Sequence, residues 1–393
     1  MRHRLFFSPG MFGFGRLASY DYFGHLERAL SERFRAAGEQ VETYVAELSP
    51  TASIRRRGMA LAELVASTCD SGAPNAGPIH LVGHSTGGLD ARLLASPSVS
   101  LGVPPQALAW RSRLASVTTI NAPHFGTPLA SFFTTVSGER VLRALSALTI
   151  IALTVGSPSL SAMSALVAAF GRVDRLLGLE VKVLDRATES LLRGLDDARS
   201  HEVRGYLDAI KGDAGAMVQL MPEAMDLFAA GIEDRPGVLY QSTASMAPLP
   251  SLSPRALVGT LLHPMSALSS TIFAILYGIT SRYDERYPCA DPRAAEDSER
   301  MLARAFGRVP GPRANDGVVP IHSQIWGKVV WVGYGDHLDV IGHFRDDPSA
   351  RKQEVGSGAP PHVDWLRSGS DFDRARFGAL VDAVAAGMLS SVR

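Results

Sequence analysis

A serine flanked by glycines is the residue best placed to carry chemistry in this chain. Residues 83–87 read Gly-His-Ser-Thr-Gly, between an apolar run at 79–82 and a helix-like segment at 89–95. A G-x-S-x-G nucleophile elbow requires this strand–turn–helix setting, because glycines let the strand and the helix pass close to a tight turn. The pattern predicts that Ser85 is a nucleophile. The alternative is a chance glycine–serine turn.

A serine nucleophile needs a base, and the base needs an acid that orients it. Behind an elbow of this type the partners follow in the chain order serine, acid, histidine. Asp316 lies in an Asn-Asp-Gly turn, and His337 follows in a Gly-Asp-His-Leu-Asp loop. Asp316 is therefore the candidate acid and His337 the candidate base, although Asp316 could also be a turn former that caps local N–H groups. His84 is a rival base, but neighbouring residues on an elbow point apart, so we expect His84 to support the turn.

An acyl-transfer site also needs N–H donors for the oxyanion. The residue after the nucleophile, Thr86, lies at the start of the following helix and supplies one of them. The second is expected from the loop after the first strand, where Met11 follows Pro9-Gly10. An ordinary glycine-rich loop at 10–15 is the alternative.

The elements that must position these residues alternate between strand and helix. Apolar or alternating runs predict strands at 5–7, 41–45, 79–82, 116–120, 238–242 and 329–332. Helical spacing predicts helices at 23–37, 55–69, 89–95 and 377–388. This alternation indicates an α/β fold with a mostly parallel central sheet and helices on both faces.

The alternation stops between residues 132 and 236, where the pattern becomes helical. We interpret this segment as a helical cap or lid, which divides the chain into core 1–131, cap 132–236 and core 237–393. Two uncharged stretches, 144–171 and 256–281, are long enough to span a bilayer. Glycine, serine and proline interrupt both, so apolar helices over a core or an interface are the favoured interpretation.

Composition bounds the remaining possibilities. The chain has 393 residues, 46% of them hydrophobic, and a formal net charge of zero. This balance does not suggest a nucleic-acid partner or an acidic substrate. The two cysteines, Cys69 and Cys289, could pair, but two free thiols are expected. The apolar run near the N-terminus is too short for a signal-peptide core, so we expect a processed form or a protein without a cleaved leader.

Together these motifs resemble the true lipases of bacteria, the Pseudomonas and Burkholderia type of triacylglycerol lipase. The matching segments are 10–14 with 21–24, 83–88, 121–127, 315–317 and 337–339. The resemblance implies an α/β-hydrolase fold and a lipase-like hydrolase that cleaves lipid esters through an acyl-enzyme. By it, Ser85 is the nucleophile, His337 the general base, Asp316 its partner, and the N–H groups of Met11 and Thr86 the oxyanion hole.

The resemblance further implies a structural Ca²⁺ near the histidine loop. Asp297 and Asp339 match its carboxylate ligands, and the backbone carbonyls of His343 and Asp347 would complete an oxygen shell suited to a hard cation. The alternatives are a helix N-cap for Asp297 and a solvated loop acid for Asp339. The chain departs from the family pattern at Pro9, where His is usual, and in lacking a cysteine just after residue 317.

The substrate implied is a lipid ester at an oil–water or membrane interface, with cap segments that cover the acyl site in water. The family is extracellular, and no stable protein partner is evident. A phospholipase or a lipid acyltransferase would use the same triad. A non-catalytic lipid-binding protein would require a lost triad member, and none is missing.

Overall fold

The computed structural model describes residues 1–11, 16–17, 20–69, 77–155, 195–250, 264–282, 296–346 and 362–392, with a few single residues between 160 and 193. Its centre is a six-stranded sheet in the order β4-β1-β5-β6-β7-β8. The strands are β1 (Arg2–Ser8), β4 (Gln40–Val45), β5 (Ile79–His84), β6 (Leu114–Ile120), β7 (Leu239–Met246) and β8 (Lys328–Tyr334). Every neighbouring pair is parallel, which confirms the predicted α/β class.

The register of the sheet brings three strand ends to one edge. Ser8 at the end of β1 pairs with Gly83, and His84 at the end of β5 pairs with Ile120 of β6. The loops that follow β1, β5 and β6 therefore leave the sheet side by side. In parallel α/β sheets this carboxyl edge is where ligands bind.

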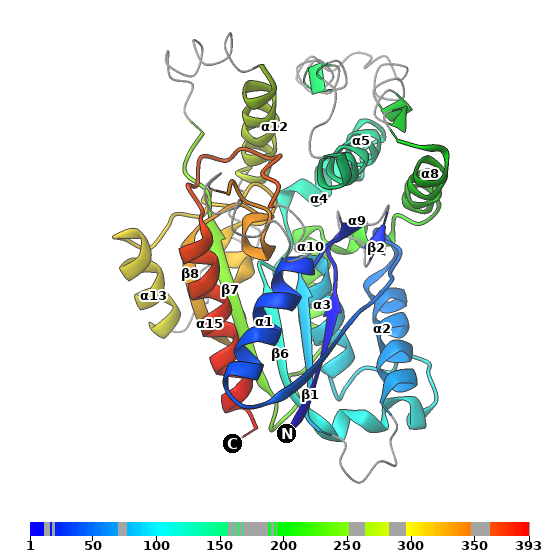
Figure 1. The fold of residues 1–393 in the computed structure, drawn as a ribbon, viewed down its shortest axis with the longest axis vertical. Coiled ribbons are helices and arrows are strands. Elements are labelled where there is room, and N and C mark those ends of the chain that lie inside the picture. Colours follow the sequence, from blue (N-terminus) through cyan, green and yellow to red (C-terminus); the bar gives the residue numbers. More distant parts are fainter. Residues whose placement is uncertain are drawn as a thin grey trace.

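Helices cover both faces of the sheet, as the alternation predicted (Figure 1). On one face, α15 (Arg374–Ser390) packs on β7 and β8 and beside α1 (Gly24–Ala36). On the other, α3 (Thr86–Ala95) packs on β1, β5 and β6, and beside α2 (Ile54–Thr68). Every residue of β5 is buried, because this central strand is covered from both sides.

The chain between β6 and β7 forms helices above the carboxyl edge of the sheet (Figure 1). In the described residues these are α4 (Pro128–Phe133), α5 (Val136–Val155), α8 (Asp197–Gly212), α9 (Gly215–Gln219) and α10 (Pro222–Gly231). A further helix, α12 (Pro264–Thr280), contacts α4 from the other side of this edge. The predicted boundary at 131 falls inside α4 and that at 236 just before β7, and the domain division stays a prediction.

Both uncharged stretches contribute helices to this region, α5 from the first and α12 from the second. Neither of these helices, nor any other in the described ranges, is both long and apolar enough to cross a membrane. Cys69 is a buried free thiol, and Cys289 lies outside the described residues.

Several short elements were not predicted. They are the hairpin β2 (Arg16–Leu17) and β3 (Tyr20–Asp21) and the 3-10 helices η1 (Pro105–Arg113), η4 (Ile321–Gln324) and η5 (Asp339–Ile341). The helix given as the alternative for Asp297 is present as α13 (Glu296–Phe306). The helix α13 packs on β8 at the edge of the sheet. Its first turn contains Asp297, which lies within the helix and not at the N-cap.

Candidate active site

Ser85 lies on a sharp turn between β5 and α3. Its backbone has φ 54° and ψ −129°, a conformation that non-glycine residues rarely adopt and that concentrates at functional sites. The N–H of Ser85 donates to the carbonyl of Ile120 at 2.9 Å, which ties the turn to β6. A Cβ on Gly83 would lie 2.1 Å from the Gly87 carbonyl oxygen, and one on Gly87 would lie 1.9 Å from that of Ser8. Both glycines are therefore required by close backbone approach.

The loop after β1 passes directly against this turn. A Cβ on Gly10 would lie 2.7 Å from Ser85 Cβ and 3.2 Å from Ser85 Oγ. Met11, the next residue, lines a small cavity together with Ser85 and Thr86. The structure thus brings both predicted oxyanion residues to the candidate nucleophile.

A buried ion pair contacts the end of β1 and the loop that follows it. The side chains of Arg57 on α2 and Asp90 on α3 are fully buried, with Nη2 and Oδ2 2.8 Å apart. Arg57 Nη2 also donates to the carbonyl of Pro9, immediately before Gly10. The Ser8 hydroxyl donates to Asp90 Oδ2 at 2.7 Å, so both partners of the ion pair contact this loop.

His337 and Asp316 meet in the buried region beside the sheet edge. His337 Nδ1 lies 2.7 Å from Asp316 Oδ2, and the His337 N–H donates to the Asp316 carbonyl at 3.0 Å. His337 Nε2 is buried and has no hydrogen-bond partner among the described residues. An imidazole held at Nδ1 by a carboxylate and free at Nε2 is the arrangement of a general base.

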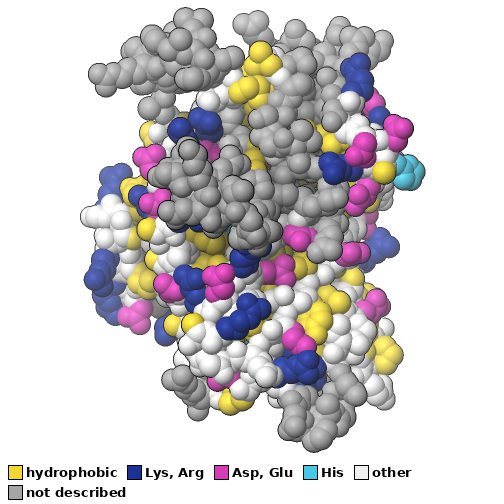
Figure 2. Space-filling view, viewed as in Figure 1, with side chains coloured by type: hydrophobic (Ala, Val, Ile, Leu, Met, Phe, Trp, Pro, Cys, Tyr) yellow, Lys and Arg dark blue, Asp and Glu magenta, His cyan; other side chains and the backbone are white. Residues whose placement is uncertain are grey.

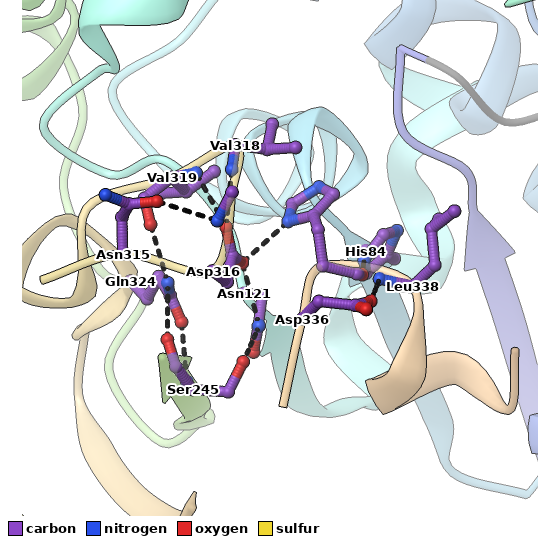
Figure 3. A network of polar contacts seen from close by, with 12 residues as sticks. His84, Asn121, Ser245, Asn315, Asp316, Val318, Val319, Gln324, Asp336 and Leu338 are labelled. Carbon is purple, nitrogen blue, oxygen red and sulfur yellow. Dashed lines mark hydrogen bonds and ion pairs between the residues drawn. The ribbon is translucent and has the colours of Figure 1, made fainter. Parts of the chain in front are cut away.

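The Asp316 carboxylate accepts hydrogen bonds from four groups, within the network drawn in Figure 3. Its Oδ1 accepts from the N–H groups of Val318 at 2.9 Å and Val319 at 2.7 Å. Its Oδ2 accepts from Asn121 Nδ2 at 3.0 Å as well as from His337. The two interpretations of Asp316 are thus compatible, since one oxygen caps the local turn and the other orients the imidazole.

A second layer of amide side chains fixes Asn121 in turn (Figure 3). Asn121 has φ 47°, and its Nδ2 also donates to Ser245 Oγ at 2.6 Å. Gln324 exchanges two hydrogen bonds with the backbone of Ser245, at 2.7 and 3.0 Å. Sequence reasoning missed these roles. The Asn-Ala-Pro-His segment offered a signal for Asn121, whereas nothing marks Ser245 or Gln324.

His84 supports the turn and does not act as a rival base. Its Nδ1 lies 2.7 Å from the Tyr22 hydroxyl and its Nε2 lies 2.8 Å from the His337 carbonyl oxygen. Since a carbonyl only accepts, Nε2 carries the proton and Nδ1 accepts from Tyr22. Burial, with a smaller effect of the neighbouring His337, holds the pKa of His84 well below its usual value. A neutral His84 thus connects the strand before Ser85 to the loop of the candidate base.

A second small cavity lies on the His337 side of the site. It is lined by residues of α5, of α12 and of the segments around His337 and Trp365, and nearly all of them are apolar. Val318 lines both this cavity and the one that contains Ser85. The cavity beside Ser85 and the cavity beside His337 are therefore neighbours.

Two of the residues expected at the calcium site have other partners in the described part of the chain, and the site stays a prediction. The Asp297 carboxylate is 87% exposed and binds Arg300 on its own helix. Asp339 is buried, and its Oδ2 accepts from the Asp336 N–H at 2.8 Å and the Ser370 hydroxyl at 2.7 Å.

The other two expected ligands give no further support. The imidazole of His343 lies 3.2 Å from the Tyr22 carbonyl, which does not test its backbone carbonyl, the expected ligand, and Asp347 lies outside the described residues. No group of three or more His, Cys, Asp or Glu side chains in the described ranges is arranged to hold a metal ion.

Comparison with known proteins gives a partial match. A stretch of 130 residues is 32% identical to a triacylglycerol lipase of Vibrio cholerae. This stretch covers 33% of the present chain and 35% of the Vibrio protein. The chain therefore matches about a third of the length of this relative. No protein-family model matches the chain.

Two solved structures overlap most of the chain at low identity. EstA from Clostridium botulinum is 19% identical and covers 92% of this chain and 88% of its own, with a TM-score of 0.48. The Staphylococcus hyicus lipase is 15% identical, and its match covers 99% of the present chain and 96% of the lipase, with a TM-score of 0.48. The Vibrio match agrees with the lipase-like resemblance, and the Pseudomonas and Burkholderia type stays a prediction.

Proposed function

We propose that this protein is a serine hydrolase that cleaves carboxylic esters of lipids through an acyl-enzyme. The observation that carries the proposal is the relation between the strained Ser85 turn and the buried His337–Asp316 pair. Val318 lines both the cavity beside Ser85 and the cavity beside His337, and His337 Nε2 is left without a partner among the described residues. Nucleophile, base and orienting acid are thereby all provided.

In this mechanism His337 Nε2 takes the proton of Ser85 as Oγ attacks the ester carbonyl. The N–H groups of Met11 and Thr86 hold the oxyanion, and each is expected to contribute on the order of 10²-fold in rate. His337 then protonates the leaving alcohol, and later activates the water that hydrolyses the acyl-enzyme. Asp316 keeps the imidazole oriented and stabilises its charged form.

The surroundings of Ser85 support an apolar acyl group. Its cavity is lined by side chains such as Leu129, Phe133 and Leu220. Leu220 follows α9, whose Val218 is 51% exposed, and Leu227 on α10 is 78% exposed. Exposed apolar residues on the helices that cover a cavity are suited to a lipid surface.

The surface charge on the face drawn in Figure 2 does not point to a different kind of substrate. Figure 2 shows acidic and basic side chains scattered over it, with no large patch of one sign. A mixed surface of this kind does not favour a polyanionic partner. The named activity of the Vibrio relative, triacylglycerol hydrolysis, agrees with a lipid ester as substrate.

The proposal is tested with tributyrin below and above its solubility limit, with Ser85→Ala and the exposed-site control Ser112→Ala. We expect hydrolysis that rises steeply once droplets form, is lost in Ser85→Ala and is kept in Ser112→Ala. Saturation on dissolved substrate would instead indicate an esterase or an acyltransferase. If an organophosphonate does not label Ser85 and the hydrolysis rate is the same in Ser85→Ala as in the wild type, the proposal is rejected.

Calcium binding is proposed from the resemblance alone, and no step above depends on it. If Asp339 binds Ca²⁺, a chelator should lower the Tm of the wild type and leave the Tm of Asp339→Asn unchanged. A wild-type Tm that responds neither to the chelator nor to added Ca²⁺ removes this proposal.

A further inference from the structure

The hydroxyl of Tyr22, which lies between β3 and α1, begins a buried chain of hydrogen bonds that ends on the candidate base. Tyr22 is 1% exposed and His84 is fully buried, so water does not compete for their polar atoms. The Tyr22 hydroxyl donates to His84 Nδ1 at 2.7 Å, and His84 Nε2–H donates to the His337 carbonyl at 2.8 Å. A carbonyl only accepts, and a neutral imidazole has one donor and one acceptor nitrogen. The direction of both bonds is therefore fixed, and the tyrosine hydroxyl orients the ring that holds the backbone of His337.

The backbone of His337 is held on both sides. Its N–H donates to the Asp316 carbonyl at 3.0 Å, and its carbonyl accepts from His84. The rings of His84 and His337 also lie close together, with their centroids 4.6 Å apart and their planes tilted by 46°. A rotation of the His84 ring would therefore disturb both the backbone and the imidazole of His337. The Nε2 atom that must reach Ser85 Oγ would move with them.

Tyr22 also holds the same loop at a second point. Its backbone carbonyl accepts from His343 Nε2–H at 3.2 Å. Residues 337–343 are thus tied to Tyr22 at both ends, by its hydroxyl through His84 and by its carbonyl. The loop is closed on itself as well, because the His343 N–H donates to the Leu338 carbonyl at 3.1 Å. The two anchors on one tyrosine therefore contribute to the position of the whole loop that carries the base.

We propose that Tyr22 is a positioning residue for the general base, and that it acts through His84 on His337. Proton transfer requires the imidazole nitrogen within about 2.6–3.2 Å of the reacting oxygen. In the proposed reaction His337 has two such transfers to make, from Ser85 Oγ and then to the oxygen of the leaving alcohol. A displaced imidazole performs both of them less well. This inference rests on the proposed ester hydrolysis.

The test compares two butyrate esters whose leaving groups differ in their need for a proton. The p-nitrophenolate ion leaves unprotonated, whereas the hexanol oxygen is too basic to leave unless His337 protonates it. We expect the ratio of kcat/KM for n-hexyl butyrate to kcat/KM for p-nitrophenyl butyrate to fall about 3- to 10-fold in Tyr22→Phe, the effect of one lost hydrogen bond. The ratio cancels any difference in the fraction of folded enzyme, so a purely structural role of Tyr22 would leave it unchanged.

The matched control is Tyr44→Phe, in the edge strand β4. The Tyr44 hydroxyl donates to Glu42 at 3.3 Å and its ring stacks on Phe6, so this variant also loses one tyrosine hydrogen bond. We expect it to keep the wild-type ratio. A wild-type ratio in Tyr22→Phe, or an equal fall in both variants, would overturn the inference. A wild type that hydrolyses neither ester would instead overturn the proposed function itself.

A double-variant cycle tests the route through His84. His84→Leu removes both hydrogen bonds of the ring, and with them the group through which Tyr22 acts. We expect Tyr22→Phe to lower the ratio in the wild-type background and to leave it unchanged in His84→Leu, since members of one network are not additive. His84→Gln, whose amide N–H can donate to the same carbonyl, should keep a ratio closer to that of the wild type. An equal fall from Tyr22→Phe in both backgrounds would show that Tyr22 acts by another route, and the inference would be wrong.

Discussion

The buried pair Arg57–Asp90 is expected to couple the stability of the core to the position of the loop that bears Gly10 and Met11. Arg57 Nε lies 3.0 and 3.2 Å from the two carboxylate oxygens of Asp90, and its Nη groups donate to the carbonyls of Ser49, Pro50 and Pro9. Arg57→Met removes all these donors and leaves the Asp90 charge buried alone. Such a loss costs about 3–5 kcal/mol of unfolding free energy.

The double variant Arg57→Met with Asp90→Leu separates the two effects. Removal of both charges avoids the uncompensated buried carboxylate, so most of the lost stability should return. The Pro9 carbonyl still lacks its donor in the double variant, so the loop that bears Gly10 and Met11 loses its hydrogen bond to α2. Since the loss of one oxyanion donor costs about 10²- to 10³-fold in kcat, we expect a partly displaced donor to cost about 10- to 100-fold.

Urea unfolding, followed by tryptophan fluorescence, gives the stabilities. The kcat and KM for p-nitrophenyl butyrate, a dissolved ester, give the catalytic effect without an interfacial step. We expect kcat to fall more than KM changes, because the oxyanion forms only during the reaction. A folded double variant with wild-type kcat/KM would refute the argument that Arg57 positions this loop.

Three further predictions concern the site and the sheet. Asp316→Asn should lower kcat on the order of 10³- to 10⁴-fold with an unchanged far-UV circular dichroism spectrum, because His337 loses its orienting carboxylate; near-wild-type turnover would contradict this role. Gly10→Ala should reduce activity while Ser85 stays reactive towards a small phosphonate, since the added Cβ meets Ser85 Cβ at 2.7 Å and the loop must shift; an unaffected kcat would show that the loop accommodates it. Burial lowers the pKa of His80 to about 3, so the folded chain lacks a proton there that the unfolded chain binds between about pH 6.5 and pH 3. The stability that neutral His80 contributes is complete above about pH 6.5 and is lost as the pH falls, by up to ~1.4 kcal/mol of unfolding free energy per pH unit. Urea unfolding at several pH values should therefore show a weaker dependence of the unfolding free energy on pH in His80→Leu than in the wild type. An equal dependence in both would exclude this residue as the cause.

The parts of the fold that follow from local pattern were predicted from the sequence. Each predicted strand of the sheet is present. The central strand β5 needs a short apolar run because it is covered on both faces, and the edge strand β4 shows the alternation of a strand that is only partly buried. The Ser85 elbow was predictable because its glycine–serine pattern lies within five residues, although the contact that requires Gly87 is with the distant Ser8 carbonyl. The chain order of acid and histidine then indicated Asp316 and His337, which the structure places in contact.

The unpredicted parts depend on contacts between distant segments. Arg57 and Asp90 lie on two different helices, and each is unremarkable as a helix residue until the helices pack. The support of the Asp316 carboxylate by Asn121 joins loops 195 positions apart. Tyr22 shows the same limit, because the hydrogen bond of its hydroxyl to His84 joins residues 62 positions apart.

The double role of the Asp316 carboxylate has a consequence for regulation. Because one of its oxygens closes the local turn through Val318 and Val319, the acid reaches its working position as soon as that turn folds. A folded but inactive form cannot be made by withdrawing the acid alone, since the turn would have to unfold with it. Any switch between an inactive and an active form must therefore act on another part of the site, such as the loop that bears Met11 or the helices above the sheet edge.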